Sequence, residues 1–266
     1  MEWLEDRRLL AAGDLDTTFG IGGQVVQDLG LGKNEEIFAS AVQSDGKMVV
    51  AGFAINTLGA GRDFLVARFN TNGTLDTSFG TGGSVIVNVS DPGPLSTPNF
   101  DDQVNDLIIQ PDGSIIAVGT ATKNVGLTPF TAVGIIKLTS SGVLDTAFDG
   151  DGKASTILKN NANANAHVTS ISTAAVQADG KIVVGGKMVA GSTEGDYVVA
   201  RYTPSGSLDV TFDGDGYTFT DFDSTLANNR DDDLLDLTIQ PDGKILAVGR
   251  SESTVSSHQV ISIARY

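Results

Sequence analysis

The chain of 266 residues carries 33 acidic and 17 basic side chains, 32 glycines and no cysteine. Its formal charge of −16 disfavours nucleic acid and anionic lipid as partners, because both present negative phosphates. The absence of cysteine excludes a disulfide scaffold, a thiol nucleophile and a cysteine-rich zinc site, and no apolar run is long enough to span a membrane.

Residues 1–12 precede the first repeated motif, and we expect an N-terminal arm or a targeting segment there. Residues 3–12 are similar to the Leu-Glu-Pro-Arg-x-Leu-Leu segment that opens many large bacterial surface proteins, although Asp6 stands where that segment has proline. The apolar stretch of about 7–15 residues that a secretory signal needs is missing. A short frayed or helical arm is the alternative interpretation.

Two motifs then recur along the chain. Each Asp-Gly turn has glutamine two positions earlier and glycine seven positions later, and the four turns begin at Asp45, Asp112, Asp179 and Asp242. The second motif, Leu-Asp-x-x-Phe, begins at Leu15, Leu75, Leu144 and Leu208. The Asp-Gly turns lie 67, 67 and 63 residues apart, and such a period predicts stacked copies of one supersecondary unit.

The second unit illustrates the strands that we expect in every copy. Strand-like runs cover residues 104–110, 114–119, 132–138 and 153–158. Turn residues separate these runs, with Pro111 and Gly113 after the first and Gly142 after the third. No helical period occurs. Four short strands per repeat predict an all-β fold, a β-propeller of four four-stranded blades.

The fourth unit stops at its third strand, because Tyr266 lies as far beyond Asp242 as Phe69 lies beyond Asp45. Residues 13–29 supply the turn and the strand that this unit lacks. We therefore expect one domain over residues 13–266, closed by the N-terminal strand joining the C-terminal blade, which would remove exposed sheet edges. The blades are expected at about 35–90, 101–158, 168–222, and 232–266 plus 13–29. The alternatives are an open array, a fragment of a longer ring, and two chains that pool their blades.

The two motifs together resemble the delta-60 repeat family, a group of bacterial proteins assigned to β-propellers. The likeness rests on Leu75-Asp-x-x-Phe-Gly80, Val42-Gln-x-Asp-Gly-Lys-x-Val-Val-Ala-Gly52 and Val66-Ala-Arg-Phe69, and it covers roughly residues 13–266. The chain departs from the family pattern at Ser114, Lys137, Asp149 and Asp213. The family has no established activity, so the resemblance implies a propeller and an extracellular or cell-surface location, but no chemistry.

Several polar residues recur in every unit and are expected to be structural. The acid of Leu-Asp-x-x-Phe and the basic residue of the third strand lie a short turn apart in one blade, which predicts an ion pair that fixes the bend. Asp76 with Arg68 illustrates the pair, and Arg201 and Arg265 are basic partners in later units. The glutamine before Asp-Gly, such as Gln110, is expected to satisfy buried backbone groups at the turn.

Two units replace Phe-Gly-x-Gly-Gly with Phe-Asp-Gly-Asp-Gly, and these turns are candidate calcium sites. The carboxylates concerned are Asp145, Asp149 and Asp151 in one unit, and Asp209, Asp213 and Asp215 in the next. Hard cations favour several oxygen ligands on a short, flexible loop. The full EF-hand pattern is missing and Asp-Gly is ordinary turn chemistry, so a plain turn is the alternative. Calcium is the one cofactor that the sequence suggests.

Carboxylates also gather where the first strand of a unit begins. They are Glu35, Glu36, Asp102, Asp106, Asp232, Asp233 and Asp236. Because the first strands of a propeller line its central channel, we expect these side chains at one channel mouth. There they could bind a cation or act as acid and base. A solvated acidic rim is the alternative.

The sequence contains no Gly-x-Ser-x-Gly elbow, phosphate loop or zinc-binding helix, and its one tryptophan and four tyrosines offer little surface for stacking sugars. No catalytic residue is therefore assigned. We expect a structural or binding module with an unidentified protein or glycan ligand, and a monomer in preference to a homodimer. The alternative function is a glycan hydrolase or lyase that uses the channel-mouth carboxylates.

Overall fold

The computed structural model describes residues 13–29, 34–55, 61–90, 101–126, 128–159, 167–189, 195–222, 231–252 and 258–266. The expected arm or targeting segment at residues 1–12 lies outside these residues. The described chain is all β, and no helix in it is long and apolar enough to cross a membrane.

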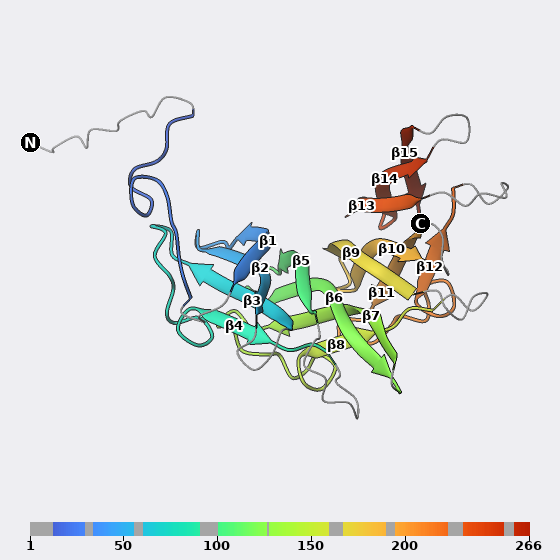
Figure 1. Ribbon diagram of the computed structural model, residues 1–266, viewed down its shortest axis with the longest axis horizontal. Helices are drawn as coiled ribbons and strands as arrows, with labels where there is room; N and C mark the ends of the chain where they lie inside the picture. Colours follow the sequence, from blue (N-terminus) through green and yellow to red (C-terminus); the bar gives the residue numbers. More distant parts are fainter. Residues whose placement is uncertain are drawn as a thin grey trace, which may run out of the picture.

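The described strands form four antiparallel sheets, each ordered as in the sequence, and we call these sheets blades 1 to 4 (Figure 1). Blade 1 contains β1 (Glu35–Val42), β2 (Met48–Ile55), β3 (Arg62–Phe69) and β4 (Ser84–Val87). Blade 2 contains β5 (Gln103–Ile109), β6 (Ile115–Val125), β7 (Thr128–Leu138) and β8 (Lys153–Thr156). Blade 3 contains β9 (His167–Val176), β10 (Ile182–Val189), β11 (Gly195–Tyr202) and β12 (Tyr217–Thr220). Blade 4 contains β13 (Asp232–Ile239), β14 (Ile245–Glu252) and β15 (Gln259–Arg265).

The blades succeed one another along an arc, with the first strands on its inner side (Figure 1). Strand β1 contacts β5, β5 contacts β9, and β9 contacts β13. The prediction of an all-β fold with first strands at the centre is therefore confirmed along the arc.

Apolar side chains fill the space between neighbouring blades. Separate buried clusters join blade 1 to blade 2, blade 2 to blade 3, and blade 3 to blade 4. The middle strands β2 and β3 are covered on both faces, which explains why their sequences are nearly continuous apolar runs instead of alternating ones. The apolar core of this fold thus lies between the blades.

The glycine seven positions after each Asp-Gly turn has a steric cause. At Gly52 a Cβ atom would collide with the backbone carbonyl oxygen of Glu36, and at Gly119 it would collide with that of Gln103. The same collision occurs at Gly186 and at Gly249. Each glycine lies beside a register shift in the first strand, so close approach of two backbones requires the missing side chain.

The expected ring closure is not present among the described residues. Blade 4 has three strands, and residues 13–29 lie at the other end of the arc, beside blade 1 (Figure 1). There the Gly20 amide donates to the Asn72 carbonyl at 2.8 Å. Only isolated bridges join Gly20 and Ile21 to Gln24, so the segment forms no strand. The fourth strands β4, β8 and β12 each pair with the third strand of their blade over only four residues. Such a short strand depends on that pairing, and residues 13–29 do not pair with a third strand here.

Candidate functional site

The repeated acid and base lie together in the first three blades. Arg68 Nε lies 2.8 Å from Asp76 Oδ2, Lys137 Nζ lies 3.0 Å from Asp145 Oδ2, and Arg201 Nε lies 2.7 Å from Asp209 Oδ2. These ion pairs tie the third strand to the bend after it. Arg265 of blade 4 is exposed and has no ion pair among the described residues.

Hydrogen bonds and charge keep the acids of these ties ionised. The Ser78 hydroxyl, Lys47 and Arg68 hold the pKa of Asp76 well below its usual range. In blade 3 the Thr211 hydroxyl comes first, with Lys181 and Arg201 adding to it, and the pKa of Asp209 is equally low. An aspartate that remains charged at any ordinary pH serves structure better than proton transfer.

The repeated glutamines act at the neighbouring Asp-Gly turns. Gln43 Nε2 donates to the Gly113 carbonyl at 3.5 Å, and Gln177 Nε2 donates to the Gly243 carbonyl at 3.0 Å. Gln110 Oε1 instead accepts the Ser114 hydroxyl at 2.7 Å within its own turn. Each of these glutamines therefore has a local polar contact that belongs to the architecture.

The two Asp-Gly-Asp-Gly turns place their first aspartate in the left-handed backbone region. Asp149 has φ 48° and Asp213 has φ 52°, matching Gly80 at 53° in blade 1. The Asp149 amide donates to the Ser205 carbonyl of blade 3 at 2.8 Å, as Gly80 donates to Ser141. Burial and the neighbouring Asp151 raise the pKa of Asp149.

The other carboxylates of these turns have separate local partners. Asp151 Oδ1 accepts the Lys153 amide at 2.9 Å, and Asp215 Oδ1 accepts the Tyr217 amide at 3.3 Å. Asp145 and Asp209 are engaged in the ties described above. Only one cluster of carboxylates among the described residues brings its ligand atoms close enough together for a single cation, and none of the six aspartates of these turns belongs to it. Calcium at these turns therefore stays a prediction.

Two of the expected channel-mouth acids are buried clamps. Asp102 is 0% exposed and accepts the amides of Val89, Ser90 and Thr122 at 2.8, 2.8 and 3.1 Å. Burial raises its pKa although these donors oppose the shift. Asp232 is buried in the same way in blade 4 and accepts the Phe222 amide at 2.9 Å. Both carboxylates hold the segment after a fourth strand to the first strand of the next blade.

Asp233 of blade 4, another of these acids, is neutralised by one cation from blade 3 and one from blade 4. Asp233 lies 2.8 Å from Lys187 Nζ and 2.6 Å from an Arg250 nitrogen. Burial opposes ionisation of Asp233, but these two cations outweigh it and lower the pKa. At the other end of the arc, burial raises the pKa of Glu35, which accepts the Leu29 amide at 3.4 Å, and Glu36 is exposed.

The two remaining acids lie on either side of β9. Asp106 of β5 accepts the Ala174 amide at 2.8 Å, and the Thr173 hydroxyl of β9 donates to Asp236 of β13 at 3.1 Å. Burial raises the pKa of Asp106, and the charge of Asp236 adds to this effect. The structure therefore brings together two carboxylates from blades 2 and 4, separated by one strand of blade 3.

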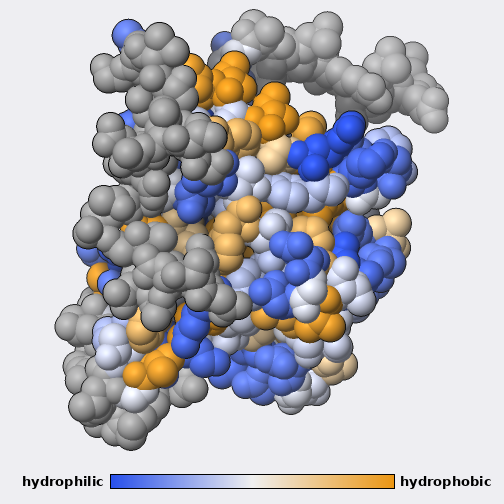
Figure 2. Space-filling model, turned by 90° about the vertical axis from the view of Figure 1, so that its right-hand side faces the viewer, coloured by the Kyte–Doolittle hydropathy of each residue, from blue (hydrophilic) through white to orange (hydrophobic). Residues whose placement is uncertain are grey.

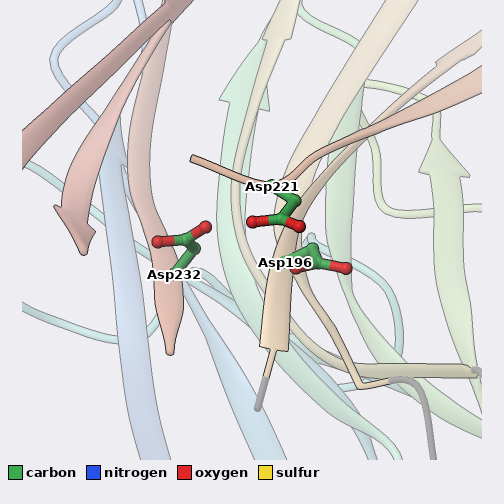
Figure 3. Close-up of side chains that lie close together, drawn as sticks. All are labelled: Asp196, Asp221 and Asp232. Carbon is green, nitrogen blue, oxygen red and sulfur yellow. The ribbon is translucent and has the colours of Figure 1, made fainter. Parts of the chain in front are cut away.

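A further acidic cluster was not predicted from the sequence. Asp196, Asp221 and Asp232 lie together where β11, the end of β12 and the start of β13 meet, with ligand atoms within 4.8 Å of one another (Figure 3). Oxygen donors so spaced suit a hard divalent cation. A comparison of equivalent positions in the repeats could have revealed this cluster. At the matching place between blades 1 and 2, Asn88 Nδ2 donates to Asp63 Oδ1 at 3.1 Å, and blade 3 has aspartate where blade 1 has this asparagine.

One family of known proteins matches most of the repeated motifs. The family described as "domain of unknown function (DUF5122) beta-propeller" matches residues 43–79, 110–148, 177–212 and 240–266, together just over half of the chain. No curated protein matches the chain. The prediction of a β-propeller repeat family is thereby confirmed.

Solved structures show more distant likenesses. The extracellular domain of a one-component system from B. thetaiotaomicron is 13% identical with a TM-score of 0.38, and the alignment covers 88% of this chain and 22% of that one. An endo-arabinase from Bacteroides thetaiotaomicron is 11% identical with a TM-score of 0.41, over 88% and 75% of the two chains. An exo-1,5-α-L-arabinanase from a bovine ruminal metagenomic library is 9% identical with a TM-score of 0.25, over 85% and 91%. Identities this low say nothing about the activity of this chain.

Proposed function

We propose that this chain, which belongs to the DUF5122 β-propeller family, serves as a binding or scaffolding module outside the cell or at its surface. The observation that supports this proposal is how the repeated charges are used. Arg68 with Asp76 and Arg201 with Asp209 form matching ties in different blades. A reaction centre needs a set of groups that one blade has and the others lack, and these residues do not form such a set.

The ligand-binding surface in this proposal is the inner side of the arc at Asp106 and Asp236. Each of the two accepts hydrogen bonds from the protein, but unlike Asp233 neither has an ion pair with lysine or arginine among the described residues. Their negative charge is therefore not neutralised there, and carboxylate oxygens can accept further hydrogen bonds from a ligand that carries hydroxyl groups or positive charge. A glycan or a basic protein surface has that chemistry. The net charge of −16 would assist the approach of a basic partner.

Three finer points belong to the same proposal. The repeats are of the delta-60 type, and residues 3–12 act as the N-terminal segment of a surface protein, which supports an extracellular location. Residues 13–29 supply the fourth strand of a blade 4, either that of their own chain or that of a second copy. The third strands of blades 1 to 3 all have such a neighbour, and this recurrence supports the assignment.

A binding screen tests the function. The purified chain, labelled on lysine, is applied to a glycan array and to solubilised bacterial envelope proteins. We expect saturable binding that Asp106→Asn with Asp236→Asn weakens at least tenfold. Asp14→Asn, at an exposed position beyond blade 1, is the matched control and should bind normally. Binding that is equal in all variants would exclude this surface.

A glycan hydrolase or lyase is the second candidate, and the raised pKa of Asp106 favours it. Acid–base catalysis uses one carboxyl group that holds its proton beside another that is ionised. Asp102 and Asp232 do not suit these roles, because both side chains are fully buried, whereas Asp106 is only half-buried. In an assay against a panel of polysaccharides, Asp106→Asn would abolish turnover with little change in melting temperature. The absence of turnover by the unaltered chain on every polysaccharide would remove this candidate.

A further inference from the structure

Neighbouring blades bury one defined face of their third strands. On β3 this face consists of Phe64 and Val66, which are both 0% exposed against blade 2. The residues at the same two positions of β7 and β11 are also fully buried against the next blade, and they are Val133, Ile135, Tyr197 and Val199. A blade therefore presents this face only to the next blade along the chain.

Blade 4 has the same face, but no blade packs on it among the described residues. The matching residues of β15 are Ile261 and Ile263, which are 84% and 55% exposed. Hydrophobic side chains gather over this end of the molecule in Figure 2. The outer edge of β15 has no neighbouring strand among the described residues, although β3, β7 and β11 each pair with a fourth strand there. An apolar face beside an open edge is a strong site for association.

In the part of the chain that the structure describes, no preceding blade packs on the opposite side of blade 1. A hollow of about 400 Å³ lies there between residues 13–29 and the blade, lined by Phe19, Val25, Ile37, Val50, Leu65 and Phe69. In blade 3 the residues matching Leu65 and Phe69 are Val198 and Tyr202, and both are buried against blade 2. The hollow is therefore the place where the face of a preceding blade would pack.

Residues 13–29 already lie on blade 1 as the end of a preceding blade would. Gly20 donates to Asn72 at 2.8 Å, as Gly80 donates to Ser141 at 2.9 Å in the next junction. Charges match as well. Asp16 stands at the position of Asp76 and is exposed, and Arg265 stands at the position of Arg68 and is exposed without an ion pair in the described part of the chain.

We propose that a second copy of this chain fills these sites, with blade 4 of one copy docking on blade 1 and residues 13–29 of the next. Figure 1 places the two ends of the arc apart. Joining them within one chain would require repacking the three blade junctions, whose cores are fully buried, whereas a second copy docks without altering them. The contact joins two different surfaces, so the association is head to tail, and the rotation from one copy to the next decides whether it closes into a ring or extends as an open array. It does not depend on what ligand the propeller binds.

Engineered cysteines test this contact without interference, because the chain has no cysteine of its own. In blade 1 Ala67 is the pairing partner of Ser84, and the matching positions in the proposed contact are Ala264 and Gln24. Directly paired residues of antiparallel strands have the Cα separation that a disulfide needs. Two single variants, Gln24→Cys and Ala264→Cys, are prepared separately, mixed and oxidised.

We expect a disulfide-linked heterodimer in the mixture and little dimer from either variant alone. The double variant should form linked ladders or rings of two or more copies. A double variant that links only within itself, with no heterodimer in the mixture, would show closure in one chain and overturn the second copy as the occupant. No disulfide in either experiment would overturn the contact itself.

A substitution on the docking face gives an independent measurement. Ile261→Asp should shift the sedimentation of the unmodified chain to that of a monomer at concentrations where the parent associates. Because Ile261 is exposed in the single copy, the far-ultraviolet circular dichroism should be unchanged. Val210→Asp, at an apolar residue 63% exposed on a turn of blade 3, is the control and should associate as the parent does. A parent that sediments as a monomer at every concentration would overturn the proposal.

Discussion

Blade 1 and blade 4 use the same motif with opposite results. In blade 1 the third-strand arginine, Arg68, is 7% exposed, stacks 4.6 Å from the Phe79 ring centre and pairs with Asp76. In blade 4 the matching Arg265 is exposed and unpaired among the described residues. The difference lies in the segment after the third strand, since blade 1 has a bend and a fourth strand there. A repeated residue thus becomes part of the core only when the neighbouring segment encloses it.

The largest expected effect comes from breaking the enclosed tie. Arg68→Met removes the cation and leaves the buried Asp76 with only Lys47 as a charged partner. Breaking a buried ion pair in this way costs about 3 kcal/mol. We expect a loss near that size in the free energy of unfolding measured by urea denaturation.

Arg265→Met is the matched control for this comparison. Its free energy of unfolding should lie within about 0.5 kcal/mol of the parent at a protein concentration where single copies dominate, because exposed charges contribute little. Equal losses for both variants would mean that enclosure does not distinguish the two blades.

The pH dependence of stability sharpens the same contrast. Asp76 and Asp209 have pKa values far below those of an unfolded chain, so the unfolded state binds protons first as the pH falls. Their stabilising contribution is complete above about pH 4 and is lost progressively below it, with a slope of up to ~1.4 kcal/mol per pH unit for each carboxylate. Asp76→Asn should flatten the acid limb of a plot of unfolding free energy against pH. If the unfolding free energy of Asp76→Asn falls as steeply at acid pH as that of the parent, other groups cause the acid sensitivity.

A smaller effect is expected where blade 2 departs from blade 1 in its turn. Asp149 adopts φ 48° where blade 1 has Gly80. Alanine in the left-handed region costs about 1 kcal/mol, and it lacks the short polar side chain with which aspartate tolerates this region. Asp149→Ala should therefore lower the free energy of unfolding by about that amount, and Asp149→Gly should leave it nearly unchanged. Thermal denaturation of the two variants measures the difference, and a tolerated alanine would contradict the backbone argument.

The architecture could be predicted from the sequence because each repeat marks how its strands pair and which of them are buried. The spacing of Gly52 and Gly119 after the turns marks where two backbones touch, and the apolar runs mark the strands enclosed by two blades. The arrangement of the fourth blade was harder to predict. The repeat pattern predicts that Arg265 pairs with an aspartate of the Leu-Asp-x-x-Phe motif. It does not say whether that aspartate comes from the same chain.

The site was less readable, because acidic side chains close in sequence have different surroundings. Asp102 and Asp106 are four positions apart, yet the first is a clamp enclosed by three backbone amides and the second is half-buried and accepts the Ala174 amide of the next blade. Asp196 and Asp221 escaped notice because the first lies in β11, the second follows β12, and they meet Asp232 only after blade 4 is packed. Burial and packing between blades decide such roles, and neither is visible in a single stretch of residues.

Calcium at the Asp-Gly-Asp-Gly turns is the prediction with the smallest expected effect. If each turn binds the ion with a dissociation constant near 1 mM, as extracellular modules do, then about 2 mM calcium stabilises the fold by roughly 0.6 kcal/mol per site. In a chain of this size that raises the melting temperature by about 1–2 °C per site. Asp149→Asn with Asp151→Asn should remove half of the shift between calcium and chelator, and Asp213→Asn with Asp215→Asn should remove the rest.

Asp221→Asn separates the turns from the cluster of Figure 3, because a shift that disappears in this variant alone would assign the ion to Asp196, Asp221 and Asp232 instead. Identical melting curves with calcium and chelator would make these turns plain loops in which Asp149 and Asp213 take the place of glycine.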